Sequence, residues 1–344
     1  MRLRMKDIAQ DLGVSVATIS RAIDLEQCHK VAPHTLKLVK EYIAAKGYIP
    51  SLAAKNLRKT RTNSIGVVFP AFEGLFQNTY YTNMLAGIAD SLLSTEFSFK
   101  LIMLNPAANR WSDVNFRLAE DVDGLLVTHW PEFFKNGRPI VTDIPCVFIN
   151  DLAQGVNAYF VCGDHFGGGR LAGKHLYDLG HRDIGVLTGI DWSTDSALRL
   201  EGIRSFFSER GTHIHDSAVV CANYNEQQAY DITEEFLKQH PKISAIFCCN
   251  DEMAIGVIRK IQEIGLRCPE DISVVGYDDI LRSQQNVPAL TTVHDPVYEL
   301  AKEGVSALMD YFRKGDFLHP FVGQKIIKTT LIARGSSGPF SVKP

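Results

Sequence analysis

The chain has 344 residues, enough for two or three domains, and its 45% hydrophobic and 22% charged content is typical of a globular protein. No apolar run approaches the roughly 18 residues of a membrane span, and the N-terminus lacks the apolar core of a signal peptide. We therefore expect a cytoplasmic protein with no membrane partner. The seven cysteines lack C-x-x-C spacing and are expected to be buried reduced thiols, with a redox pair at Cys248 and Cys249 as the less favoured alternative.

The net charge of −3 is unevenly distributed along the chain. Residues 1–61 contain 12 Lys and Arg against 5 Asp and Glu, so this part carries +7 and the remainder carries −10. A basic head on an acidic body indicates that only the head binds a polyanion such as DNA. A basic surface that only faces solvent is the alternative.

The stretch from Met5 to Ile23 predicts two short helices joined by a tight turn. Gly13 gives the turn its backbone freedom, and Ser15 stands where an N-cap hydroxyl would accept a backbone N–H of the second helix. The residues expected to be buried are Ile8, Ala9, Leu12, Val14, Thr18 or Ile19, and Ile23. The residues expected to point outward from the second helix are Val16, Ala17, Ser20 and Arg21. Such a helix fits a DNA major groove, although an ordinary helical hairpin has the same pattern.

A third helix is expected over 33–46, before a glycine that marks its end. The next segment, 51–58, is too short to be helical alone, since isolated helices below about 12–15 residues are marginal in water. We expect it to become helical against DNA, with Lys55 and Arg58 on phosphates and a leucine wedge in a minor-groove base step. A plain basic linker is the alternative.

From Ser64 onward, apolar strand-like runs alternate with amphipathic helices. Such alternation predicts parallel sheets covered by helices on both faces, and its fresh start near Gly168 predicts two doubly wound lobes. The expected strands are 65–69, 99–104, 124–128, 146–149, 184–187, 219–221, 246–248 and 273–277. The expected helices are 82–94, 168–179, 197–209, 227–238, 252–264 and 297–314, and the segment 325–332 follows them. In this architecture a ligand binds in a crevice at the carboxyl ends of the strands.

Several motifs occur in a fixed order along the chain. They are K-D-I-A at 6–9, G-V-S-V-A-T-I-S-R at 13–21, G-Y-I-P at 47–50, L-G-H-R-D-I at 179–184, L-R-L-E-G at 198–202, N-D-E-M-A-I-G at 250–256, D-I-S-V-V-G-Y-D-D at 271–279 and L-T-T-V at 290–293. With these motifs the chain resembles the LacI/GalR (lactose/galactose repressor) family of bacterial transcription regulators over nearly its whole length. The resemblance implies an α/β core of the type I periplasmic-binding-protein fold, a homodimer on a pseudo-palindromic operator in double-stranded DNA, and a small effector between two lobes.

The resemblance also implies how the chain is divided. The expected parts are a helix-turn-helix DNA-binding domain at 1–50, a hinge helix and linker at 51–61, and an effector-binding and dimerisation core at 62–344. Within the core, the N-lobe is expected at about 62–163 and 294–322, and the C-lobe at about 164–293 and 323–336. No leucine-rich heptads follow Arg334, so a dimer is preferred to a tetramer joined by a C-terminal coil.

The family pattern further implies roles for individual residues of the head. Val16 and Ala17 are implied to read bases, with Ser20 and Arg21 beside them, and Arg21 can pair bidentately with guanine. The residues implied to position phosphates are Ser15 and Thr18. Leu57 matches the intercalating leucine of the hinge.

In the core, the resemblance implies that Arg199, Asn250 and Asp278 hold polar groups of the effector and that Tyr224 stacks on it. Four more effector-binding candidates depart from the family pattern or follow predicted strands: Asn150, His165, Trp130 and Trp192. The stretch 72–81 is also unusually aromatic. The guanidinium of Arg199, the amide of Asn250 and the carboxylate of Asp278, together with aromatic rings, suit a neutral molecule rich in hydroxyl groups. We therefore expect a sugar as the effector first and a purine or nucleoside second.

Catalysis has little support in the sequence. No G-x-G-x-x-G follows the first strand, and no Walker lysine or G-x-S-x-G elbow is present. His213 and His215 lack nearby third and fourth ligands, and the adjacent Asp278 and Asp279 are expected to point apart at a strand end. We expect no enzyme activity, no metal and no cofactor. A solute-binding module without a DNA role and an enzyme on the same two-lobed fold remain the alternatives.

Overall fold

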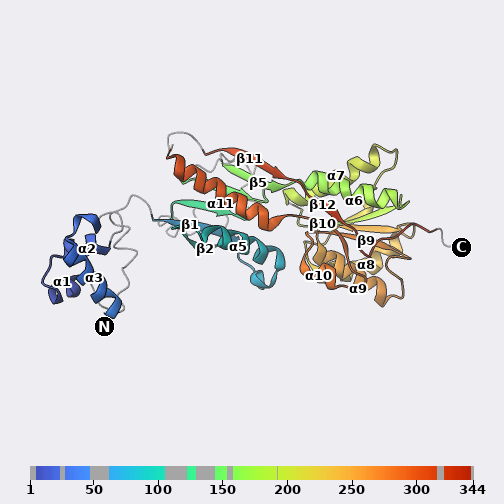
Figure 1. The fold of residues 1–344 in the computed structure, drawn as a ribbon. Helices are drawn as coiled ribbons and strands as arrows, with labels where there is room; N and C mark the ends of the chain where they lie inside the picture. The colour runs from blue at the N-terminus through green and yellow to red at the C-terminus, as the bar shows by residue number, and fades with distance from the viewer. Residues whose placement is uncertain are drawn as a thin grey trace. The chain divides into compact units, whose positions relative to one another are not determined.

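The computed structural model describes residues 5–23, 28–46, 62–104, 122–128, 144–152, 158–191, 193–315 and 321–341 (Figure 1). It divides into two compact units, Met1–Thr62 and Asn63–Pro344. We refer to the first as the head and to the second as the core. The predicted hinge at 51–61, Trp130 and Trp192 lie outside the described residues. No helix in the described part of the chain is long and apolar enough to cross a membrane.

The head is a small helical unit. Its elements are α1 (Met5–Asp11), α2 (Val16–Ile23), the 3-10 helix η1 (Cys28–Lys30) and α3 (Pro33–Lys46). The predicted pair of short helices is thus confirmed, and Gly13 lies in the turn between them with φ +63°, a value that glycine adopts without strain. The buried apolar residues of the head are Ile8, Ala9, Ile19, Ala22, Val31 and Val39. Of the two candidates for the buried position on α2, Ile19 is fully buried and Thr18 is half-buried.

The N-lobe of the core contains a six-stranded parallel sheet in the order β11-β5-β4-β3-β1-β2. The strands are β1 (Ser64–Pro70), β2 (Ser98–Leu104), β3 (Gly124–Val127), β4 (Cys146–Ile149), β5 (Tyr159–Gly163) and β11 (Gly323–Ile327). The 3-10 helix η2 (Leu75–Gln77) precedes α5 (Thr79–Leu92), which packs with α11 (Val297–Lys314) and buries apolar strand residues such as Val67. The two helices approach closely at Gly87, where a Cβ would lie 2.4 Å from the carbonyl oxygen of Tyr298.

The C-lobe contains a second six-stranded sheet in the order β12-β10-β9-β8-β6-β7, parallel except for β12. Its strands are β6 (Ile184–Thr188), β7 (Val219–Cys221), β8 (Ala245–Cys248), β9 (Ser273–Tyr277), β10 (Thr291–His294) and β12 (Thr330–Ile332). Its helices are α6 (His165–Asp178), α7 (Thr194–Ser208), the 3-10 helix η6 (Asp216–Ala218), α8 (Glu226–Gln239), α9 (Asp251–Glu263) and α10 (Leu281–Gln285). The predicted doubly wound lobes are therefore confirmed.

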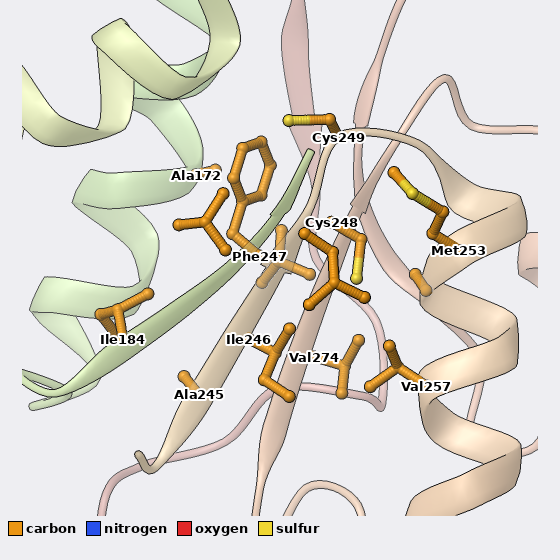
Figure 2. Packing of buried hydrophobic residues seen from close by; sticks show 14 of the residues in the cluster. Ala172, Ile184, Ala245, Ile246, Phe247, Cys248, Cys249, Met253, Val257 and Val274 are labelled. Atoms are coloured by element: carbon orange, nitrogen blue, oxygen red, sulfur yellow. The ribbon is translucent and has the colours of Figure 1, made fainter. Parts of the chain in front are cut away.

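The core of the C-lobe is built around β8, which is apolar on both faces (Figure 2). Phe247 lies on the side of Ala172 from α6, while Cys248 lies on the side of Met253 and Val257 from α9. None of the seven cysteines forms a disulfide; five are buried, whereas Cys28 and Cys221 are half-exposed, so the expectation of buried thiols was wrong for those two. Burial raises the pKa of the Cys249 thiol to about 12, which makes it a poor nucleophile near neutral pH.

Three short connections cross between the lobes: from β5 to α6, from β10 to α11 and from β11 to β12. The assignment of 323–336 to the C-lobe was wrong for β11, because β11 pairs with β5 in the N-lobe sheet. The last crossing therefore lies between Ile327 and Thr330. The side chains of β11 are mostly exposed, so the strand has no apolar run that would have identified its sheet.

Candidate functional site

The exposed face of α2 carries the side chains that the sequence assigns to DNA. Val16, Ala17 and Arg21 are exposed; Ala17 and Arg21 lie on the side of α2 opposite the buried Ile19, and Val16 lies in the first turn of the helix. Ser15 caps α2, since its Oγ accepts the backbone N–H of Thr18 at 3.0 Å. Its hydroxyl also lies 2.9 Å from Thr18 Oγ1. The structure thus brings these residues to one end and one face of a short helix.

The partly exposed Ser20 lies on α2 as well. The three remaining DNA-binding candidates, Lys55, Leu57 and Arg58, lie outside the described residues, and their roles stay predictions.

The core contains a cavity lined by both lobes, at the carboxyl ends of the strands. The N-lobe contributes Asn78, Tyr80, Tyr81, Thr128, Asn150 and Asp151. The C-lobe contributes Ile190, Ser193, Thr194, Asp195, Arg199, Tyr224, Asn250, Glu252, Asp278 and Ile280. We call this cavity the crevice. Five of the predicted effector residues line it: Asn150, Arg199, Tyr224, Asn250 and Asp278.

Arg199 is the centre of a buried charge cluster, which we call the Arg199 cluster. Its guanidinium lies 3.4 Å from Asp195 Oδ2, 3.4 Å from Asp278 Oδ1 and 3.5 Å from Asp295 Oδ2. Its Nη1 also donates to the Cys249 carbonyl at 2.5 Å, and its face lies over the Tyr277 ring at 3.8 Å. Because only 1% of Arg199 is exposed, these contacts replace most of its hydration.

The carboxyl groups of this cluster differ in their pKa. Burial by itself raises the pKa of Asp195, but the nearby Arg199 and the hydroxyls of Ser193 and Tyr224 lower it to about 2. Burial raises the pKa of Asp278 well above its ordinary value despite the same Arg199. Asp195 is therefore the ionised partner of the guanidinium, and Asp278 holds its proton more readily.

Tyr224 follows β7 and forms part of the C-lobe wall. Its hydroxyl donates to Asp195 Oδ2 at 2.9 Å and lies 2.9 Å from Ser193 Oγ. Its ring packs so closely on Gly189 that a Cβ there would lie 2.1 Å from the ring. The close contact fixes the ring, which can then stack on a bound ligand.

Asn250 has a structural use as well as a place in the crevice. Its Oδ1 accepts the backbone N–H of Met253 at 3.0 Å and caps α9, and its Nδ2 donates to the Tyr224 carbonyl at 3.4 Å. One amide thus joins the start of α9 to the loop that carries Tyr224.

Asn150 joins the N-lobe wall to a crossing between the lobes. Its Nδ2 donates to Tyr80 Oη and to Asp295 Oδ2, both at 2.7 Å, and its Oδ1 accepts the Gly163 N–H at 3.0 Å. Since Asp295 also contacts Arg199, a continuous polar path runs from Tyr80 in the N-lobe to Arg199 in the C-lobe.

The prediction that His165 binds the effector is not supported, because His165 is absent from the lining of the crevice. The ring is buried behind Arg199, with Nδ1 3.4 Å from the guanidinium Nε and 3.4 Å from Tyr277 Oη. Burial and the charge of Arg199 lower the pKa of His165, so it is a neutral acceptor that positions the arginine.

Several lining residues were missed from the sequence. Asp195 lies one helical turn before Arg199, but the predicted helix began two residues after it, so the pair was not recognised. Tyr80 and Tyr81 lie in the stretch whose aromatic content was already unusual. Asp295, a buried partner of Arg199 that does not line the crevice, was missed as well; it follows β10, a strand that was not predicted.

Backbone strain is concentrated at the crevice. Asn150, Tyr224 and Asp278 have φ values of +59°, +58° and +106°, and all three line the cavity. Non-glycine residues adopt such conformations rarely and at an energetic cost, and the positions that retain them are often functional.

Two family models match the chain. One, described as bacterial regulatory proteins of the lacI family, matches residues 4–51, and the other, described as a periplasmic binding protein-like domain, matches residues 174–337. The chain is 31% identical over 310 residues to the HTH-type transcriptional repressor PurR of Pasteurella multocida (strain Pm70), covering 89% of this chain and 91% of that protein. It is 32% identical over 309 residues to PurR of Haemophilus influenzae (strain PittEE), covering 89% and 90%.

Solved structures show the same fold. The transcriptional regulator CelR in complex with cellobiose matches with a TM-score of 0.70 and 25% sequence identity. The Lac repressor bound to ONPG in its repressed state matches with a TM-score of 0.80 and 25% sequence identity. Each match covers 98% of this chain and 100% of the other. A LacI family regulator from Enterococcus faecium with bound ribose matches with a TM-score of 0.67 and 25% sequence identity, and the match covers 81% of this chain and 100% of the other. The chain therefore belongs to the lacI family of bacterial regulatory proteins and is a DNA-binding transcription regulator rather than an enzyme.

Proposed function

We propose that this regulator is a repressor whose operator affinity is controlled by a sugar bound in the crevice. The observation that carries the proposal is the lining itself. It combines hydroxyl, amide and carboxylate groups from both lobes with the fixed ring of Tyr224. Such groups hold a polyhydroxylated ring on its edges and on one face. The solved relatives with cellobiose and ribose favour the same ligand class.

A purine or nucleoside is the second candidate, favoured by the similarity to the PurR repressors. Its flat ring would stack on Tyr224, while the amide of Asn250 and the carboxyl of Asp278 would bind its edge. A thermal-shift panel of sugars, purine bases and nucleosides on the full-length protein separates the two candidates, because a bound effector raises the unfolding temperature by mass action. Stabilisation by purines and not by sugars would overturn the first choice.

The effector would act by changing the angle between the lobes. It contacts both walls of the crevice, so it favours the lobe arrangement in which it makes more contacts. We propose that the core is a homodimer and that its lobe movement changes how the two predicted hinges, residues 51–58, meet a pseudo-palindromic operator. The ordering of these hinges on DNA would then be the step that the effector controls.

We propose that Val16, Ala17, Ser20 and Arg21 read bases and that Ser15 and Thr18 contact phosphates. Selection from a random DNA pool by the full-length protein would give the operator. Arg21→Ala should then weaken operator binding by about 1–3 kcal/mol and relax one position. Lys59→Ala, which removes a cation of the predicted hinge and linker at 51–61, should weaken binding to all sequences about equally. Unchanged base preference in Arg21→Ala would show that α2 is not the reading helix.

A further inference from the structure

The crevice has an excess of acidic side chains. Its acidic lining residues are Asp151, Asp195, Glu252 and Asp278, and Arg199 is the one cationic side chain that lines it among the described residues. Glu252 is matched by Arg282 at 2.5 Å, outside the Arg199 cluster. Apart from Asp151 on the N-lobe side, the excess is therefore located at the Arg199 cluster, where one guanidinium faces three carboxyl groups.

Each guanidinium nitrogen of Arg199 already faces at least one acceptor of the protein. Nε faces the Nδ1 of His165, Nη1 faces the Cys249 carbonyl and Asp278, and Nη2 faces Asp195 and Asp295. Five groups of the protein thus share the three guanidinium nitrogens. A phosphate or carboxylate entering the crevice would meet the oxygens of Asp195 and Asp278 in place of the guanidinium.

The carboxyl groups differ in how far they face the cavity. The side chains of Asp195 and Asp278 are 25% and 10% exposed and line the crevice, whereas that of Asp295 is fully buried. Asp295 Oδ1 has no hydrogen-bond partner among the described residues, while its Oδ2 accepts from Asn150 and lies 3.5 Å from Arg199. The low pKa of Asp195 keeps a negative charge on the crevice wall near neutral pH.

We propose that the crevice rejects anions: the effector lacks phosphate and carboxylate groups and is uncharged or carries an ammonium group, and Asp195 and Asp278 impose this choice. The proposal rests on the proposed function, in which the crevice holds the effector. It excludes sugar phosphates, sugar acids and nucleotides within the classes considered above. A charge in a partly desolvated cavity is screened little, so the ionised Asp195, beside the carboxyl oxygens of Asp278, suffices to repel an anion.

Inorganic phosphate is the probe for the first test. Three full-length proteins are unfolded thermally in phosphate and in chloride at equal ionic strength. They are the wild type, the double variant Asp195→Asn/Asp278→Asn and the control double variant Asp178→Asn/Asp216→Asn. The control removes the same two charges from exposed sites on the C-lobe surface. Comparison among the three proteins cancels the general stabilisation that phosphate gives to folded proteins.

We expect no saturable phosphate effect in the wild type or in the control. In Asp195→Asn/Asp278→Asn, Arg199 is released from two carboxylates, and its phosphate affinity should rise at least about tenfold. Saturable phosphate binding by the wild type would overturn the proposal. So would a folded double variant that gains no phosphate binding.

If the double variant does not fold, the wild type alone decides the question with matched ligands. Thermal shift is used to compare two series of ligands. The first is glucose, glucosamine and glucose 6-phosphate, and the second is adenosine and adenosine monophosphate. Binding of either phosphorylated member overturns the proposal, and its absence supports it. A protein that rejects phosphate and binds no sugar or nucleoside would contradict the proposed function and leave the rejection of anions standing, so the two failures can be told apart.

Discussion

The two walls of the crevice are built differently. The C-lobe wall carries most of the charged side chains of the crevice, and two of them, Asp195 and Asp278, already pair with Arg199. Most of the N-lobe wall is uncharged and offers the hydroxyls of Tyr80, Tyr81 and Thr128 and the amide of Asn150. We infer that the C-lobe wall is rigid and sets the permitted charge of a ligand. The N-lobe wall would supply adaptable hydrogen bonds and respond to the shape of the ligand.

The two walls are linked through Asp295, which lies at the crossing from β10 to α11. One of its oxygens contacts both Asn150 from the N-lobe and Arg199 from the C-lobe. A ligand that changes the angle between the lobes has to change these contacts. Substitutions at Asn150 and Arg199 therefore test the difference between the two walls.

The largest expected effect follows from removing the centre of the charged wall. Arg199→Ala leaves the buried Asp295 and the partly buried Asp195 and Asp278 without their common cation and should lower the free energy of unfolding by about 3–5 kcal/mol. The control Arg313→Ala, which breaks an exposed pair with Asp310, should cost no more than about 1 kcal/mol. Urea unfolding at neutral pH measures both. Equal losses in the two variants would contradict the view that the C-lobe wall is held by its charges.

A smaller loss in the free energy of unfolding is expected from substitutions in the N-lobe wall. Asn150→Gly removes the hydrogen bonds to Tyr80, Asp295 and Gly163 and should cost about 2–3 kcal/mol. Asn150→Ala should cost about 1 kcal/mol more, because alanine tolerates the φ of +59° poorly whereas glycine adopts it freely. The difference between the two variants, measured by urea unfolding, isolates the backbone strain. If both variants were as stable as the wild type, the link between the walls would carry no energy.

The third prediction uses pH to test the charge on Asp195. Its pKa is about 2 in the folded protein against 3.8 for an unperturbed group, so its stabilising contribution is present above about pH 4 and is lost as the pH falls toward 2. Asp195→Asn should therefore be less stable than the wild type by about 2 kcal/mol at neutral pH, and the gap should narrow as the pH is lowered through that range. Asp216→Asn, at a side chain that is 95% exposed, should show almost no gap. A gap that does not depend on pH would mean that the charge of Asp195 is not what stabilises the wall.

The smallest effect on stability is expected at a partly exposed group of ion pairs in the C-lobe. His294 lies 3.3 Å from Asp279, which also pairs with Arg334, and the hydrogen bond to Asp279 raises the pKa of His294. Its contribution is fully present below about pH 6.5 and is lost as the pH rises through the raised pKa. His294→Gln should cost a few tenths of a kcal/mol at about pH 6 and nothing at about pH 9, because solvent screens the pair. A loss as large as that of Asp195→Asn would remove the distinction between buried and exposed clusters.

Most of the fold was predictable because long elements carry strong periodicity. The helix over 297–314 and the strand over 273–277 were predicted with the bounds that the structure has. β5, β10 and β11 were missed: β5 and β10 have only five and four residues, and β11 exposes most of its side chains and lacks the apolar run of a buried strand. The predicted lobe bounds near 163 and 294 lie at the ends of β5 and β10, and only the last crossing, after β11, was misplaced.

The site was predicted in part, for a related reason. Arg199, Asn250 and Asp278 belong to motifs and were identified, but the motifs say nothing of what each side chain already binds. Asp195 and Asp295 share the guanidinium of Arg199, and the contact of Arg199 with Asp295 joins residues 96 positions apart, which only the folded chain brings together. His165 was misassigned because the start of α6 places its ring behind the arginine.

The central claim is that a ligand in the crevice changes the affinity of the head for its operator. The direct measurement is fluorescence anisotropy of selected operator DNA, titrated with the full-length protein at increasing concentrations of the sugar or nucleoside that stabilises it. We expect the operator dissociation constant to change at least about fivefold at saturation, and linkage requires the operator to change the ligand affinity by the same factor. A ligand that binds the crevice and leaves operator affinity unchanged would contradict the account.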